Sequence, residues 1–314
     1  MPDWVLTVVR WAVLLRHPHL TYRYWKIDRT KRLPNPANPQ TANDKFFWRK
    51  IFDRSPEFIE VSDKLRVRGW LKGNQIDVEA PAVLWTGNDP AKIPDDLLAK
   101  GVVVKANHGS GTNIFLEKAP PDRKAFNRRM RRYGRKPQGR KSLEWAYFGI
   151  SRRLFVEALI PDITSEFKVY TFGRRIERLQ IIYDRFSEDG ISADVWLPDG
   201  QGGWNLFEGS PDITRSANRP MPAITEEVLE LSRKIGDHFD HMRVDILAST
   251  SQLWFSELTV YSLAGHIPLV GDLSSEAVNT SWDLQESWFM RTPQTGWLKI
   301  YADHLRKVIT PGDR

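Results

Sequence analysis

The feature that most constrains the fold is a set of short strand-like runs that follow one another with tight turns between them. The longest, SEFKVYTFGRRIERLQIIYDRF over residues 165–186, alternates well enough to predict two strands joined at Gly173. Other strand-like runs occupy residues 101–109, 112–119, 152–160, 241–248 and 253–261. Helices are interspersed irregularly among them, so the pattern indicates an α+β protein built largely on antiparallel sheet.

Several helices are predicted around these runs, among them EVSDKLRVRGWLKG, with Ser62 or Asp63 as a candidate cap. KFFWRKIFDRSP forms one that stops at Pro56, and DPAKIPDDLLAKG forms one closed by Gly101. Another begins after residue 224, with Thr225 as its cap. Its predicted buried face consists of Val228, Leu231, Ile235 and Phe239.

Composition excludes several classes of protein. Hydrophobic residues make up 41% and charged residues 27% of the 314 residues, which is typical of a soluble globular protein. The absence of cysteine excludes disulfide frameworks and thiolate metal sites. No apolar run approaches the roughly 20 residues that cross a bilayer. The N-terminus also lacks the basic start and cleavage site of a secretory signal.

Two segments have a composition that allows contact with an anionic partner. Residues 4–15 predict a short helix that either lies on a membrane surface, followed by the basic, aromatic stretch 16–32, or packs on the protein's own core. The run from Arg123 to Lys141 carries ten Lys or Arg and no acid, and contributes much of the net charge of +7. It is interpreted as a solvated face, a mobile arm or a polyanion contact. No nucleic-acid recognition motif accompanies the run, which argues against nucleic acid as the partner.

The run 241–248 and the run 253–261 together suggest a metal site. If their turn centres near Ser251, Asp245 lies opposite Glu257 and shares a face with Arg243 and Thr259. The two carboxylates would then have Cβ atoms about 5 Å apart, which is unfavourable unless a cation lies between them. Oxygen ligands of this kind suit Mg²⁺. The alternatives are a solvent-facing acidic pair, or one acid paired with Arg243.

The stretch VVVKANHGSGTN suggests a phosphate loop. Lys105 ends an apolar strand, and Gly109 and Gly111 permit positive φ and a close backbone approach. Backbone N–H groups in such a turn can bind an anion. The stretch matches neither the P-loop nor the dinucleotide fingerprint, and an ordinary turn remains the alternative. Together with the carboxylate pair, it would make the two halves of an ATP site.

An ordered set of residues carries a family resemblance. The set consists of Lys64 in SDKLRVRGWL, Lys105 in VVVKANHGSGTN, Glu157 in LFVEALI, Glu166 and Lys168 in SEFKVYTFG, Asp245 in MRVDI and Glu257 in FSELTV. Its order resembles the ATP-grasp superfamily. KANHGSG, EFKVYTFG, YDRF, RVDI and SELTVYSLAG resemble, within it, the TupA-like ATP-grasp family of polysaccharide-biosynthesis proteins. The resemblance covers roughly residues 33–268.

The resemblance implies an ATP-grasp fold, in which two α+β lobes clamp a nucleotide, with an N-terminal helical extension. It implies an extension over residues 1–45, a first ATP-grasp part over 46–100, a glycine-loop lid subdomain over 101–157, and a C-terminal lobe with the metal site over 158–314. The implied ATP contacts are Lys64, Lys105, the lid residues His108, Gly109, Ser110, Gly111 and Thr112, the hinge residues Glu157, Ala158 and Leu159, and Glu166 and Lys168. Asp245 and Glu257 would hold Mg²⁺, and Arg243 with Lys105 would stabilise the transferred phosphoryl group.

One departure concerns the second metal strand, where many superfamily members have Glu-x-Asn and this chain has Glu257-Leu258-Thr259. A second metal ion is therefore in doubt. The resemblance implies an ATP-dependent carboxylate–amine ligase acting on a cell-envelope or capsular polysaccharide or its precursor. Arg174 and Arg185 are candidate acceptor contacts. The implied location is cytoplasmic, with peripheral contact at the inner membrane face. The alternatives are a Mg·ATP phosphotransferase acting on a glycan and a non-enzymatic polyanion-binding protein.

Overall fold

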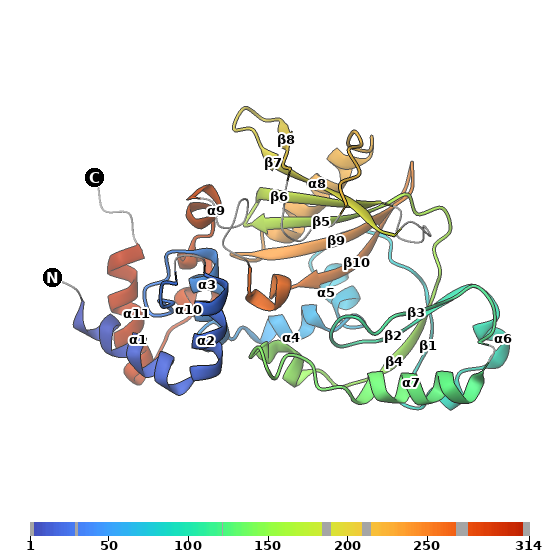
Figure 1. Ribbon diagram of the computed structural model, residues 1–314, viewed down its shortest axis with the longest axis horizontal. Helices are drawn as coiled ribbons and strands as arrows, with labels where there is room; N and C mark the ends of the chain where they lie inside the picture. The colour runs from blue at the N-terminus through green and yellow to red at the C-terminus, as the bar shows by residue number, and fades with distance from the viewer. Residues whose placement is uncertain are drawn as a thin grey trace. The chain divides into compact units, whose positions relative to one another are not determined.

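The computed structural model describes residues 3–28, 31–120, 122–183, 190–208, 215–267 and 276–309 (Figure 1). Contacts within the chain define two compact units, each made of separate stretches. Unit 1 comprises Met1–Ser55, Phe167–Val244 and Thr259–Arg314, and unit 2 comprises Pro56–Glu166 and Asp245–Leu258. The division into four consecutive segments stays a prediction about subdomains. Within the described part of the chain, no helix combines the length and hydrophobicity that a membrane span requires.

Unit 2 is built around a four-stranded sheet with the order β1-β4-β2-β3. The strands are β1 (Val83–Gly87), β2 (Val102–Ala106), β3 (Ile114–Leu116) and β4 (Leu154–Ala158), and all three neighbouring pairs are antiparallel. Its helices are α4 (Pro56–Ser62), α5 (Val67–Gly73), η1 (Pro90–Lys92), α6 (Asp95–Leu98), α7 (Arg123–Arg135) and η2 (Trp145–Gly149). The antiparallel pairing confirms the strand prediction for this half of the chain.

Helix α7 covers one face of that sheet and forms the core of unit 2. Phe126 and Met130 from α7 are buried against Val102, Val104 and Val156, together with other apolar side chains of the sheet. Asp122 caps the helix by accepting a hydrogen bond from the Ala125 N–H at 2.8 Å. The basic run is therefore an amphipathic helix rather than a mobile arm, because apolar residues at i and i+4 share one face.

Unit 1 contains β6 (Arg175–Tyr183), β7 (Ser192–Pro198) and β8 (Trp204–Leu206), while β5 (Ser165–Phe172), β9 (Met242–Ala248) and β10 (Leu253–Thr259) contribute residues to both units. The six strands form one sheet in the order β10-β9-β5-β6-β7-β8. Strands β5 and β6 are joined at Gly173, which has φ 58°, as the sequence predicted. The α+β fold class is confirmed.

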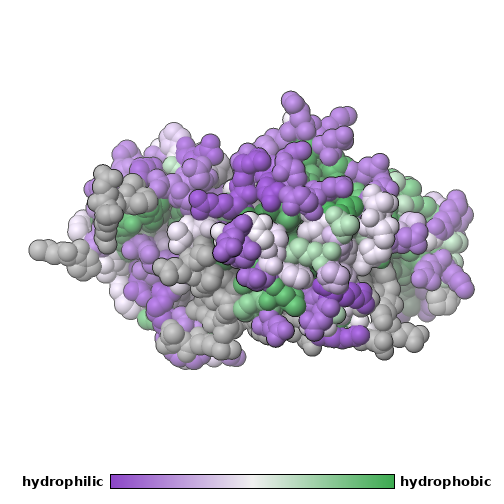
Figure 2. All heavy atoms as spheres, turned by 90° about the horizontal axis from the view of Figure 1, so that it is seen from above, coloured by the Kyte–Doolittle hydropathy of each residue, from purple (hydrophilic) through white to green (hydrophobic). Residues whose placement is uncertain are grey.

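The helices of unit 1 come from both ends of the chain. They are α1 (Trp4–Arg16), α2 (Pro18–Ile27), α3 (Ala42–Ile51), α8 (Thr225–Gly236), η3 (Ser262–Gly265), α9 (Glu276–Ser281), η5 (Leu284–Glu286), α10 (Trp288–Arg291) and α11 (Gly296–Ile309). The predicted buried face of α8 is confirmed. Figure 2 shows one face of the molecule, on which hydrophilic side chains dominate and hydrophobic ones form separate small patches.

Three helix predictions differ from the structure. The segment predicted as one helix closed by Gly101 forms η1 and α6 instead, because Ile93, which precedes Pro94, is extended. Helix α3 ends at Ile51, and Pro56 begins α4 instead of stopping the preceding helix, because proline is tolerated in the first turn where no N–H is needed. Thr225 is the first residue of α8 rather than its cap, and its hydroxyl donates to the Pro222 carbonyl at 2.6 Å. A β-turn-like contact before the helix therefore replaces the expected side-chain cap.

Candidate functional site

The centre of the predicted site in unit 2 is an ion-pair network on the sheet face opposite α7. Residues Val103, Lys105, Phe155 and Glu157 share this face, since Val103 pairs with Glu157 and Lys105 with Phe155. The Lys105 ammonium contacts Glu157 Oε1, and the Arg68 guanidinium contacts Glu157 Oε2 at 3.2 Å. Glu157 is only 4% exposed, so one buried carboxylate is held between two cations.

Arg68 is a site residue that the sequence analysis missed. Its Nη1 also donates to the Pro81 carbonyl at 2.6 Å, which fixes the guanidinium beside β4. Burial lowers the pKa of Arg68, and the negative charge of Glu157 opposes that shift. The sequence feature that could have indicated Arg68 is its spacing from Lys64. The two residues are four apart in KLRVR, and residues one helical turn apart lie on the same side of a helix.

A second ion pair joins a predicted phosphate ligand to a predicted metal ligand. The Lys64 ammonium contacts Glu257 Oε2, and both side chains are partly exposed. The Lys64 N–H donates to the Asn107 carbonyl at 3.0 Å, two residues beyond Lys105. The structure therefore brings Lys64, Lys105, Glu157 and Glu257 into one unit, with a backbone hydrogen bond linking the segments that carry the two lysines.

The predicted lid is the hairpin loop between β2 and β3. Gly109 has φ 75° and Gly111 has φ 69°, so both glycines adopt the conformation that the sequence predicted. Ser110 and Gly111 are exposed. Asn107 fixes the start of the loop, because its side chain accepts from the Arg153 N–H at 2.7 Å and donates to the Ser151 carbonyl at 3.0 Å. The tip is thus open to solvent while its base is tied to the segment before β4.

His108 has the environment of a structural histidine. Its side chain is buried, and Nε2 lies 3.1 Å from the Lys136 carbonyl just after α7. Burial lowers the pKa of His108, so the ring is neutral near pH 7. Thr112, at the other side of the loop, is buried and its hydroxyl has no hydrogen-bond partner among the described residues. A role of either residue in phosphate binding stays a prediction.

The predicted hinge after Glu157 has its backbone donors engaged. The Ala158 N–H donates to the Ala82 carbonyl at 2.9 Å, and the Leu159 N–H donates to the Gly101 carbonyl at 3.1 Å. Backbone recognition of a base by these two residues would therefore use their carbonyl oxygens.

The predicted metal ligands both belong to unit 2. Asp245, in β9, is 2% exposed, and Glu257, in β10, is partly exposed. The hairpin turn differs from the prediction, because the Ser249 N–H donates to the Gln252 carbonyl at 2.9 Å. If the two strands paired regularly from that turn, Asp245 would lie opposite Ser256. The buried residues Phe255 and Leu258 are three positions apart, however, so buried and exposed side chains do not alternate regularly along β10. Among the described residues no group of three or more His, Cys, Asp or Glu could hold a metal ion.

The remaining predicted residues have varied environments. Glu166, in β5, is half-buried and belongs to unit 2, whereas Lys168, in the same strand, is half-buried in unit 1. Arg243 is buried in unit 1, two residues before Asp245. Arg174 is exposed and contacts Asp237 at 3.5 Å, so it is engaged on the surface. Arg185 lies outside the described residues.

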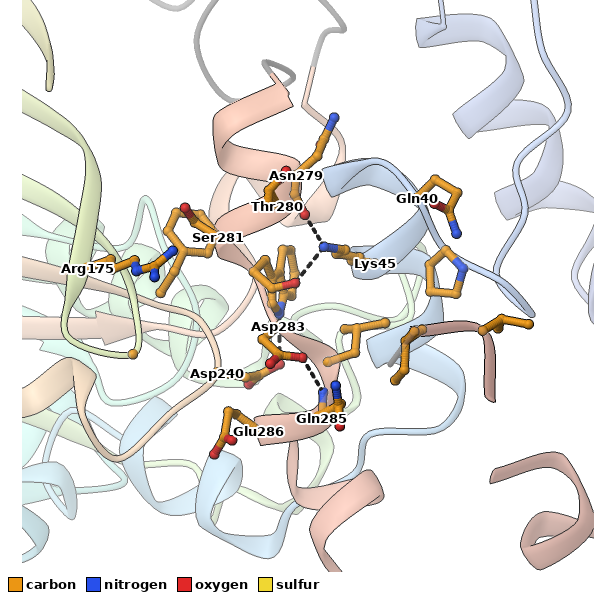
Figure 3. A pocket seen from close by; sticks show the side chains of 17 residues that line it. Gln40, Lys45, Arg175, Asp240, Asn279, Thr280, Ser281, Asp283, Gln285 and Glu286 are labelled. Atoms are coloured by element: carbon orange, nitrogen blue, oxygen red, sulfur yellow. Dashed lines mark hydrogen bonds between the residues drawn. The ribbon is translucent and has the colours of Figure 1, made fainter. Parts of the chain in front are cut away.

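Unit 1 contains a cavity that no sequence feature indicated (Figure 3). Its volume is about 640 Å³, and α3, the turn after β5, α9 and η5 contribute to its walls. Lys45 lies there with its ammonium bonded to the carbonyls of Asn279 and Trp282, and Asp240 receives the Trp282 indole N–H at 2.7 Å. Burial lowers the pKa of Lys45 to about 8. These contacts attach the C-terminal helices to α3, which is a structural role.

Comparison with known proteins identifies the family. The family model described as TupA-like ATPgrasp matches residues 44–268. No curated protein matches the chain. Similar solved structures include the ATP-grasp ligase PsnB with its minimal precursor (14% identity, TM-score 0.39, covering 73% of this chain and 62% of PsnB).

Another similar structure is the D-alanine–D-alanine ligase of Helicobacter pylori (10% identity, TM-score 0.43, covering 81% of this chain and 69% of that one). PsnB has also been solved with Mg and ADP. The chain spans 62% of the length of PsnB. The family model covers most of the sequence, so this chain belongs to the TupA-like ATP-grasp family and has the ATP-grasp fold.

Proposed function

We propose that the protein is an ATP-dependent carboxylate–amine ligase that acts on a cell-envelope or capsular polysaccharide or its precursor. The observation that carries the proposal is the pair of ion pairs in unit 2, Lys64 with Glu257 and Lys105 with Glu157. Each joins a lysine suited to phosphate oxygens with a carboxylate. Their segments are linked through the Lys64–Asn107 backbone hydrogen bond. Family membership supports the reaction class, and the substrate follows from the family's association with polysaccharide synthesis.

The ion pairs suggest how the site changes when nucleotide binds. A triphosphate offers both lysines stronger, multiply charged partners, so it would draw Lys64 from Glu257 and Lys105 from Glu157. Arg68 would keep Glu157 neutralised, and the exposed Ser110–Gly111 tip would present backbone N–H groups to the phosphates. The cations would thus be held in position before the ligand arrives, which lowers the cost of organising the site.

Asp245 and Glu257 fit Mg²⁺ because they supply two carboxylates and no soft ligand, and this ion needs only one or two protein carboxylates. The bound ion would neutralise charge on the phosphate oxygens. Glu257, once released by Lys64, would be free to ligate it. Arg243, two residues from Asp245 along β9, is our candidate for the charge that develops on the transferred phosphoryl group.

The reaction requires no nucleophilic side chain. A carboxylate oxygen of the substrate attacks the γ-phosphorus, ADP leaves, and an acyl phosphate forms. An amine then attacks the acyl carbon, the amine proton leaves, and inorganic phosphate departs. The glycine loop would exclude water from the acyl phosphate. We place the reaction in the cytoplasm, with peripheral contact at the inner membrane face, and regard Arg174 and Arg185 as candidate contacts to an anionic acceptor.

A thermal-shift series with Mg·ATP tests the proposal. At a hundredfold excess over the dissociation constant, ligand binding stabilises the wild type by about 2.7 kcal/mol. The shift should vanish in Lys105→Ala and Asp245→Asn. Lys100→Ala is the matched control, because Lys100 is an exposed lysine of the same unit whose ammonium pairs with the exposed Asp96 at 3.5 Å. An unchanged melting temperature of the wild type with Mg·ATP would refute nucleotide binding.

Product analysis then separates the two reaction types. A ligase releases ADP only when a carboxylate and an amine are both present. A phosphotransferase would instead leave phosphate on the glycan, and this outcome would replace the ligase proposal while leaving the ATP site intact.

A further inference from the structure

Helix α1 has an exposed face composed of apolar residues. Trp4, Val8, Trp11 and Leu15 are 72%, 58%, 49% and 76% exposed, and their spacing of four, three and four residues places them on one side of the helix. The opposite side packs on the protein, since Val5, Leu6, Val13 and Leu14 are buried. The two sequence-based alternatives for this helix are therefore compatible, because it packs on the core and still presents two tryptophans to solvent.

Helix α11, which contacts α1, also has exposed apolar residues. Its exposed residues include Trp297 and Ile300. His304 lies one turn beyond Ile300, and its Nδ1 is 2.5 Å from Asp3, the residue that caps α1 beside Trp4. Figure 1 shows α1 and α11 next to each other in unit 1. The Asp3–His304 contact thus joins the start of α1 to the side of α11 that carries Trp297 and Ile300.

Exposed basic residues follow this surface along the chain. Residues 1–33 contain seven Lys or Arg and only two acids, Asp3 and Asp28. Arg16 at the end of α1 and Lys26 at the end of α2 are exposed, as is Lys31, and these three residues are called the basic border here. Arg32 is excluded from it, because it is paired with Asp28 at 3.8 Å and with Asp44 at 2.8 Å. An apolar, tryptophan-bearing helix face with a basic border is the composition that binds at the interface of an anionic bilayer.

We infer that α1, with the adjoining face of α11, is a docking surface for an anionic lipid bilayer, on which the tryptophans enter the headgroup region and the basic border contacts lipid phosphates. A second copy of the chain is a poorer occupant, because two-fold pairing through this face would bring identical basic borders together. The inference does not depend on the ligase proposal, since it involves unit 1 residues alone.

Co-sedimentation of the full chain with vesicles tests the inference. The vesicles contain phosphatidylcholine with about 30% phosphatidylglycerol, and phosphatidylcholine alone serves for comparison. The wild type should bind the anionic vesicles and lose affinity as salt is raised. Trp4→Ser with Trp11→Ser should bind at least about tenfold more weakly, because apolar area that would enter the bilayer is removed. Arg16→Gln should weaken binding by about fivefold.

The matched control is Phe148→Ser, which removes an aromatic side chain of similar exposure from η2 in unit 2 and should not change vesicle binding. The Mg·ATP thermal shift, measured on every variant, shows separately that the fold and the nucleotide site persist. Two results would overturn the inference. One is that the wild type binds no anionic vesicles, or that the tryptophan variant binds them as strongly as the wild type does. The other is a wild-type dimer that the tryptophan variant converts to a monomer, which would assign the face to a second copy of the chain.

Discussion

Replacing Glu157 by glutamine tests whether the ion-pair network is organised as the structure indicates. The change keeps the size of the side chain but removes the charge that neutralises Lys105 and Arg68. Breaking a buried pair by removing one partner costs about 3–5 kcal/mol. Lys105 and Arg68 keep 14% and 26% of their side chains exposed, so solvent screening places the expected loss near the lower end, at about 3 kcal/mol.

The corresponding change in melting temperature depends on how much of the chain unfolds together. An unfolding entropy of about 2.1 cal/mol/K per residue gives a fall of about 5 °C if all 314 residues unfold cooperatively. Unit 2 alone has about 125 residues, and its independent unfolding would give a fall of about 11 °C. Differential scanning calorimetry distinguishes the two cases, because independent units give two transitions.

Mg·ATP provides the second half of this test. In Glu157→Gln the two cations have lost their carboxylate, so triphosphate no longer competes with Glu157, and the ATP-dependent shift should exceed that of the wild type. Glu79→Gln is the matched control, because Glu79 is an exposed acid of the same unit whose side chain accepts one hydrogen bond from Gln252 at 2.9 Å. The free energy of unfolding of Glu79→Gln should differ from that of the wild type by no more than about 0.5 kcal/mol. A Glu157→Gln variant as stable as the wild type, with the same ATP shift, would refute the reasoning.

Two further predictions concern stability. Met130→Ala should destabilise the protein by about 2–5 kcal/mol in urea unfolding, because Met130 is fully buried between α7 and the sheet, and a loss below 1 kcal/mol would contradict that packing. The pKa of Lys45 is lowered from 10.5 to about 8, so on raising the pH the folded chain releases this proton before the unfolded chain does. Between pH 8 and 10.5 the ionisation of Lys45 therefore makes the free energy of unfolding rise by roughly 3 kcal/mol. Lys45→Met should flatten the rise of the free energy of unfolding with pH. An unchanged rise in this variant would show that the pKa of Lys45 is not lowered in the folded chain.

The strands and their turns were predictable from local pattern. Alternation along residues 165–183 and the glycine at 173 specify two adjacent strands, because side chains alternate between faces and only glycine adopts φ 58° at no steric cost. The loop after Lys105 was predictable for the same reason. The order of charged residues along the chain identified the family, which the match over residues 44–268 confirms.

Tertiary structure decided which charges meet. Glu157 was predicted as a hinge residue, and nothing in its local sequence indicated that its carboxylate lies between Lys105 and Arg68, which are 52 and 89 residues away. The same holds for Lys64 and Glu257, and for the contact between Lys45 and the C-terminal helices.

The basic run near residue 130 is another segment whose conformation was set locally and whose packing was set by the fold. Its charges suggested a solvated segment, but two apolar residues one turn apart gave α7 a side that could pack on the sheet. Local conformations follow directly from the order of residues, since they depend on steric limits and on the period of apolar residues. Only the folded chain determined the ion pairs and the apolar outer face of α1, because both depend on which distant segments exclude water from one another.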